Sequence, residues 1–212
     1  MDNERAIKIV TGISIAIFAE ACLVSLGWIF GIIELTRLTP GDINMKLPTA
    51  VMFLLSAAGL FLILRCATGN CEISSVILPG VSLSIIIIMG LIALDEILGV
   101  QTGLENILVL GEYPIYGWGS GLPSIITLIN FLLFGVICIF SLFESAKRKQ
   151  LIGFAGWFIA ATGFLATMGY IFSLPTLYLR VDSLTPIALN TAISFFALGF
   201  AMIIISKLNK QA

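Results

Sequence analysis

Six long apolar stretches, separated by short polar loops, make up most of this 212-residue chain. They cover residues 7–31, 48–64, 77–98, 123–143, 151–172 and 186–206. A membrane-crossing helix needs about 20 mainly apolar residues. Within hydrocarbon, runs as continuous as these satisfy their backbone hydrogen bonds only as helices. The pattern therefore predicts an all-α, polytopic membrane protein with six transmembrane helices in a single membrane domain, residues 1–212.

The ends of these stretches carry a pattern that occurs three times. One stretch closes with a short tag, and after a polar loop the next stretch opens with Thr-x3-Phe. The tags are Gly27-Trp28-Ile29-Phe30-Gly31, Asp95-Glu96-Ile97-Leu98-Gly99 and Gly169-Tyr170-Ile171-Phe172-Ser173; the openings are Thr49 with Phe53, Thr127 with Phe131, and Thr191 with Phe195. From the isoleucine of the tag to the threonine, the separation is 20, 30 and 20 residues. Recurrence at this scale indicates internal repetition, so we expect three helical hairpins, at residues 7–65, 77–143 and 151–206.

Composition and charge support a membrane location and predict an orientation. Apolar residues account for 59% of the chain, charged residues for 11%, and the mean hydropathy is +1.11, far from the balance of a soluble domain. Eight basic residues fall on the side of the two termini and three on the other: Arg5, Lys8, Arg65, Lys147, Arg148, Lys149, Lys207 and Lys210 against Arg37, Lys46 and Arg180. The positive-inside rule then predicts a multi-pass protein of the cell (inner) membrane with both termini in the cytoplasm. These basic clusters are short and flank the spans, so they do not indicate a nucleic-acid surface.

The chain contains no histidine, which excludes histidine-ligated haem and zinc sites and Ser-His or Cys-His nucleophile pairs. We therefore expect no enzyme, no cofactor and no metal site. Cys22 and Cys138 lie within apolar stretches, where cysteine usually serves packing. Cys66 and Cys71 flank a short loop on the predicted cytoplasmic side, where disulfides are rarely kept. A single Cys-x4-Cys pair is weak evidence for a metal or redox site.

Glu20 is an intramembrane ionisable residue, near the middle of the first apolar stretch. A carboxyl group at that depth costs a few kcal/mol unless it is protonated, paired or facing water, so it marks a candidate functional site. The alternative is a protonated carboxyl group that binds a neighbouring helix and does nothing further. Ile88 and Thr162 occupy the corresponding repeat positions, so the carboxyl group is not part of the repeat itself.

Small residues on two stretches predict close helix contacts. One group is at residues 56–59, and the other consists of Gly153, Gly156, Ala160, Ala161 and Gly163. Such residues let the backbones of membrane helices approach each other.

Aromatic and charged residues gather on the predicted outer side. The long middle loop, residues 99–122, mixes aromatics with glycines, and either a lid over the bundle or an aromatic belt at the membrane interface accounts for it. A ligand entering between the outer helix ends would meet seven residues, which we take as candidate ligand-binding residues: Trp28, Arg37, Glu96, Tyr113, Trp118, Tyr170 and Arg180.

Residues 169–178, followed by residues 184–192 with Phe195 and Gly199, resemble the multi-span membrane input regions found ahead of PAS, histidine kinase or diguanylate cyclase modules in prokaryotic signalling proteins. Residues 46–50 with residues 53–55 resemble the opening of the second span in the same regions. The resemblance implies a sensory input module that passes a conformational change through its helices. Such regions normally precede cytoplasmic signalling modules, whereas about six residues follow the last span here. The family has no agreed ligand, so no binding residue is carried over from it.

The leading hypothesis is thus a sensory or ligand-responsive input module with an extracytoplasmic-facing site. Its expected partners are the lipid bilayer and a cytoplasmic signalling module or protein, with homo-oligomerisation left open and no nucleic acid. Two alternatives remain. The chain is a small transporter or channel subunit that uses Glu20, or it is an accessory subunit of a larger membrane complex.

Overall fold

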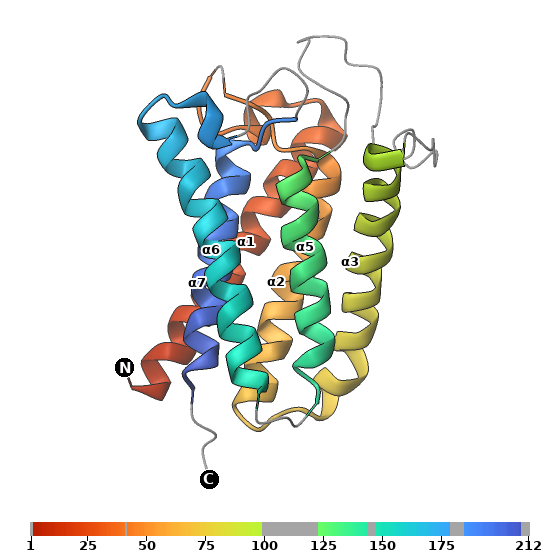
Figure 1. Ribbon diagram of the computed structural model, residues 1–212, viewed down its shortest axis with the longest axis vertical. Coiled ribbons are helices and arrows are strands. Elements are labelled where there is room, and N and C mark those ends of the chain that lie inside the picture. The colour runs from red at the N-terminus through yellow and green to blue at the C-terminus, as the bar shows by residue number, and fades with distance from the viewer. Residues whose placement is uncertain (1, 41, 99–122, 144–146, 179–184, 209–212) are drawn as a thin grey trace.

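The computed structural model describes residues 2–40, 42–98, 123–143, 147–178 and 185–208, without the side chains of residues 95–98. Every regular element in these ranges is a helix, and the long helices run side by side as a bundle (Figure 1). They are α1 (Asn3–Phe30), α2 (Leu47–Ala67), α3 (Glu72–Leu98), α5 (Ile125–Phe140), α6 (Arg148–Ile171) and α7 (Leu189–Ser206), with two short 3-10 helices, η1 (Ile33–Thr36) and η2 (Pro175–Tyr178). The predicted all-α class is confirmed.

Five helices are long and apolar enough to cross a membrane, namely α1, α2, α3, α6 and α7. This is consistent with a multi-pass membrane protein. α5 has only 16 residues, or roughly 24 Å at 1.5 Å per residue, against a hydrocarbon core of about 30 Å. Its start is fixed by the Ser124 side chain, which accepts a hydrogen bond from the Thr127 backbone N–H at 3.2 Å. A sixth crossing therefore stays a prediction.

The start of α1 and the end of α7 lie at the same end of the bundle (Figure 1), which we call the terminal end. α2, α5 and α7 begin at the opposite end, which we call the far end. Both termini lie at one end of the bundle, as an even number of membrane crossings requires. The cytoplasmic location of that side remains a prediction.

Three phenylalanines form the centre of the bundle. Phe53 of α2, Phe131 of α5 and Phe195 of α7 are each at most 1% exposed, and each pair of rings has its centroids 4.9 Å apart. Aromatic pairs at this separation are mutually attractive beyond the area they bury. These residues are the phenylalanines of the three Thr-x3-Phe openings, so the motif brings three helices together at one point.

The loops that follow α1 and α6 make the same contacts at corresponding positions. Ile32 N donates to Gly27 O at 2.8 Å, and Leu174 N donates to Gly169 O at 2.7 Å. Each loop then forms a 3-10 helix whose last residue accepts a hydrogen bond from the segment ahead of the next long helix: Met45 N to Thr36 O, and Ile187 N to Tyr178 O. The corresponding middle loop lies outside the described residues, and three repeated hairpins remain a prediction.

α6 and α7 pack backbone against backbone. A Cβ placed on Gly199 would lie 2.5 Å from Gly156 O, and one on Gly163 would lie 2.6 Å from Ala192 O. The close helix contact predicted from the small residues of α6 is therefore confirmed, and α7 is the helix that fills it. Of the predicted group, Ala161 instead lies on the exposed side of α6.

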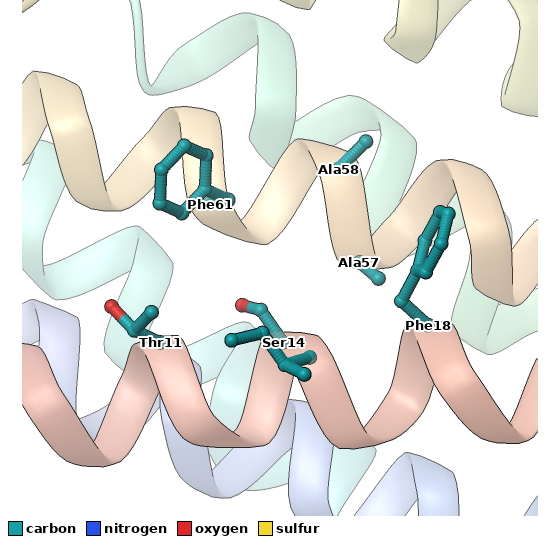
Figure 2. A pocket seen from close by; sticks show the side chains of 7 residues that line it. Thr11, Ser14, Phe18, Ala57, Ala58 and Phe61 are labelled. Atoms are coloured by element: carbon teal, nitrogen blue, oxygen red, sulfur yellow. The ribbon is translucent and has the colours of Figure 1, made fainter.

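The small residues of α2 face two neighbours. Gly59 lies against α5, where an added Cβ would be 3.2 Å from the Phe134 ring. Ala57 and Ala58 border an apolar cavity of about 390 Å³ between α1 and α2, opposite Ser14 (Figure 2).

One sequence expectation is wrong. Cys66 and Cys71, in the connection from α2 to α3, are joined by a disulfide with their Cα atoms 4.2 Å apart. Spacing alone did not predict this bond, because its formation depends on how tightly the intervening turn closes. Cys22 and Cys138 are free thiols within helices.

Candidate functional site

A small polar cavity lies at the far end, where α2, α5 and α7 begin. It is lined by one threonine from each helix, Thr49, Thr127 and Thr191, each at most 3% exposed. Each threonine precedes its central phenylalanine by four residues, which places both side chains on one face of the helix. We call this space the threonine cavity. Its volume is about 10 Å³, which is room for about one water molecule.

The cavity is electropositive because three helix N-termini meet there. The N-cap residues Lys46, Ser124 and Ala188 all line it. A helix N-terminus carries about half a positive charge on N–H groups that lack intrahelical partners. Ser124 caps α5, whereas the N-caps of α2 and α7 make no side-chain hydrogen bond. The N–H groups of Thr127 and Thr191 already donate to the side chains of Ser124 and Asn190, so the helix ends contribute mainly the partial positive charge of their dipoles.

Lys46 adds a full charge. It is half-buried, and burial lowers the pKa of its ammonium group because the charged form loses hydration. Within the described part of the chain it makes no ion pair. An anion in the cavity would supply the missing countercharge.

Some polar groups that line the cavity have hydrogen-bond partners and one does not. The hydroxyls of Ser124 and Thr127 are hydrogen-bonded to each other at 2.8 Å. Asn44 Oδ1 is buried and has no hydrogen-bond partner. A buried polar atom without a partner costs about 1–3 kcal/mol, and such atoms in native structures are normally met by water or a ligand. Because Asn44 Oδ1 is an acceptor, a guest that satisfies it must donate a hydrogen bond, as water does.

Two of the predicted ligand-binding residues, Trp28 and Tyr170, bind the segments that lead into α2 and α7 beside this cavity. Trp28 Nε1 donates to Met45 O at 2.8 Å, and Tyr170 OH donates to Ile187 O at 2.7 Å, each reaching seventeen residues along the chain. Each accepting carbonyl belongs to the residue just before the N-cap of α2 or α7. The Tyr170 ring also stacks on that of Tyr178, with centroids 4.2 Å apart.

Of the remaining predicted residues, only Arg37 has a described side chain. Arg37 is half-buried directly after η1. Tyr113, Trp118 and Arg180 lie outside the described residues, and Glu96 belongs to α3 but its side chain is not described. Ligand binding by these residues stays a prediction.

Glu20 connects two helices. The Ser194 hydroxyl of α7 donates to the Glu20 carboxyl group of α1. At the corresponding position of the third predicted repeat, Thr162 of α6 accepts a hydrogen bond from Asn130 Nδ2 of α5 at 2.9 Å. A polar contact between neighbouring helices thus occurs at both positions, although only one carries a carboxyl group.

The sequence did not indicate Thr49, Thr127, Thr191 or Lys46 as binding residues; they entered through the repeat, the charge distribution and the family resemblance. The signal that could have revealed the cavity was the repeat itself, because equivalent positions on three helices converge if the hairpins surround a common axis. Among the described residues, no group of three Cys, Asp or Glu side chains is placed to hold a metal ion.

Comparisons with protein families, with curated proteins and with solved structures find no match for this chain.

Proposed function

We propose that this chain is a sensory membrane module, made of three helical hairpins in the inner membrane, that responds to a small anionic solute in the threonine cavity. The far end faces the outside and the termini face the cytoplasm. The observation that carries the proposal is the cavity itself, where three helix N-termini, three buried threonines and a desolvated lysine surround a space for one small guest.

The tightness of the cavity suggests how binding becomes a signal. A space of about 10 Å³ holds about one water, so a larger anion must move the starts of α2, α5 and α7 apart. The three phenylalanines one turn below are in mutual contact. Closely packed side chains transmit displacement because they do not compress. α7 runs from the cavity to the terminal end (Figure 1), where an output protein or module would detect the shift.

A ligand produces such a change only if it binds one conformation better than the other. In this mechanism the empty cavity favours the compact arrangement and the occupied cavity favours the spread one. The positive charge of Lys46 and the dipoles of the three helix N-termini supply the difference in affinity.

The test is thermal unfolding of the purified protein in detergent, in a constant background of sodium gluconate. Sodium chloride, nitrate, acetate and phosphate are added one at a time. We expect at least one anion to stabilise the fold saturably, by about 2.7 kcal/mol at a hundredfold excess over its Kd. Lys46→Met and Thr191→Val should abolish this gain. Lys207→Met, which removes an exposed lysine at the terminal end, should keep it.

A second measurement separates sensing from simple binding. Amide hydrogen exchange at the terminal ends of α1 and α7 is compared with and without the stabilising anion. A change in exchange there supports the sensory function. Binding with no change at the terminal end would contradict it, and no stabilisation by any of the four anions would contradict the anion site.

A further inference from the structure

The disulfide at the terminal end closes a turn that is already well ordered. Asn70 N donates to Arg65 O at 2.9 Å, and the Thr68 hydroxyl donates to Arg65 O at 3.0 Å. Gly69 adopts φ +98°, a conformation that glycine reaches without strain. Cys66 and Cys71 are five residues apart in sequence. Because the entropic benefit of a disulfide grows with the loop it closes, a loop this short gains little, and stability alone is a weak reason for the bond.

The position of the bond also conflicts with a permanent disulfide. The connection between α2 and α3 lies at the terminal end (Figure 1), which carries eight of the eleven basic residues and is therefore predicted to be cytoplasmic. In that compartment thiols are kept reduced, and the disulfides that do form there are usually transient, either catalytic or redox-sensing. A disulfide that forms and breaks reversibly is compatible with the cytoplasmic location that the distribution of basic residues predicts.

We propose that Cys66 and Cys71 are a redox site that exchanges between disulfide and dithiol with a cytoplasmic protein dithiol. The proposal uses the orientation of the proposed function but not the threonine cavity. Cys66 is 3% exposed and Cys71 is half-buried, so the sulfur of Cys71 is the accessible point of attack.

The exchange transfers two electrons from the partner dithiol to the disulfide. A thiolate of the partner attacks Cys71 Sγ, the S–S bond breaks, and its electron pair leaves on Cys66 Sγ, which takes a proton from solvent. The partner's second thiolate then attacks the mixed disulfide and releases Cys71, which also takes up a proton. The partner leaves as a disulfide, and the site holds two thiols. The reverse sequence re-forms the bond and reduces the partner.

Reduction removes the disulfide cross-link between Cys66 and Cys71 but neither the backbone that connects α2 to α3 nor the hydrogen bonds of the turn. The turn therefore keeps both sulfurs close enough to re-form the bond, which a reversible site requires.

The experiment uses a chain with Cys22→Ala and Cys138→Ala in native membranes, so that Cys66 and Cys71 are the only cysteines of the chain that can be labelled. Membranes are equilibrated in glutathione buffers from fully oxidised to fully reduced, quenched with acid and labelled with a mass-shifting maleimide. We expect either no label or two labels per chain, with the midpoint inside the cytosolic range of glutathione ratios. Cys71→Ser, which leaves Cys66 alone, should carry one label throughout when labelled in denaturant.

The accessible side is measured with a membrane-impermeant maleimide on reduced, sealed vesicles of both orientations. Labelling of inverted vesicles alone supports the proposal. Labelling only from the outside, a pair that stays oxidised in the most reducing buffer, or a pair that never oxidises would each overturn it. The anion measurements do not depend on this pair, so failure of one proposal can be distinguished from failure of the other.

Discussion

The contact between α6 and α7 predicts a large effect for a single added methyl group, in Gly199→Ala. The new Cβ would lie 2.5 Å from Gly156 O and 2.8 Å from Ala160 Cα. Both are backbone atoms, so no side chain can rotate to make room. To reach ordinary van der Waals contact near 3.4 Å, the two helices must separate locally by nearly 1 Å.

That separation weakens the packing along the whole contact between α6 and α7. Gly163 packs on the backbone of α7 as closely as Gly199 packs on α6, so a displacement at one point opens contacts at the other. A gap of 0.5–1 Å removes about a quarter to a half of the dispersion energy of each atom pair, and overpacking by one methyl group costs about 1–3 kcal/mol, occasionally more. Because the obstacle here is backbone, we expect a loss of about 3 kcal/mol.

The free energy of unfolding is measured in mixed detergent micelles, with helicity followed by circular dichroism. Gly12→Ala is the matched control, since it makes the same change inside α1 where nothing lies within 4 Å of the added Cβ. Alanine there is expected to be neutral or to stabilise by up to about 1 kcal/mol through helix propensity. If Gly199→Ala differs from Gly12→Ala by less than about 0.5 kcal/mol, α6 and α7 are not in backbone contact.

Four further predictions test other parts of the structure. Phe131→Ala should cost about 3–5 kcal/mol of unfolding free energy, whereas Phe140→Ala, on the exposed side of the same helix, should cost far less; equal losses would contradict the central triad. Tyr170→Phe removes the hydrogen bond to Ile187 O and should cost about 0.5–1.5 kcal/mol with unchanged ring stacking, and no loss in the same unfolding assay would show that this bond does not hold the loop. In Glu20→Gln the side chain can still accept a hydrogen bond from Ser194, so its free energy of unfolding should stay within about 0.5 kcal/mol of wild type. Glu20→Ala removes the acceptor and should lower the free energy of unfolding by about 0.6–1.7 kcal/mol. Loss of solute flux in proteoliposomes that contain Glu20→Gln would instead favour a transporter. Burial lowers the pKa of Lys46, so above that pKa the unfolded chain binds more protons at this residue than the folded chain does. In anion-free buffer the free energy of unfolding should therefore rise with pH, from the lowered pKa up to about 10.4. Lys46→Met should lack this rise, and parallel curves of unfolding free energy against pH for the two proteins would contradict the argument.

The all-helical class and the positions of the helices could be predicted because hydrophobic length alone determines them. Each of the six described α-helices overlaps one of the six apolar stretches, and most discrepancies are at the ends. α5 is the informative case: its apolar stretch continues past residue 140, but the helix ends with Phe140. Composition shows where a helix can exist, whereas its end depends on capping and on the chain that follows.

The residues that border the threonine cavity could not be predicted from the sequence, for a physical reason. The sequence marks Trp28 and Tyr170 because they lie in the repeated tags, among the aromatic and charged residues of the predicted outer side. Both contain an N–H or O–H group that seeks an acceptor, and each finds a carbonyl in its own loop. The threonines were less conspicuous, since their role depends on three helices meeting, which no single stretch of sequence reveals.

Glu20 shows how the repeat alters the interpretation of an unusual residue. Considered alone, a carboxyl group in an apolar helix suggests transport. Its corresponding residue Thr162 also makes a polar contact with the neighbouring helix, through Asn130, and Glu20 makes its contact through Ser194. Ser194 and Asn130 each lie three residues after the threonine of their opening motif, so both contacts occur at one register of the bundle. In both places the neighbouring helix supplies a hydrogen-bond partner at this depth, and joining α1 to α7 accounts for Glu20 without requiring ion movement.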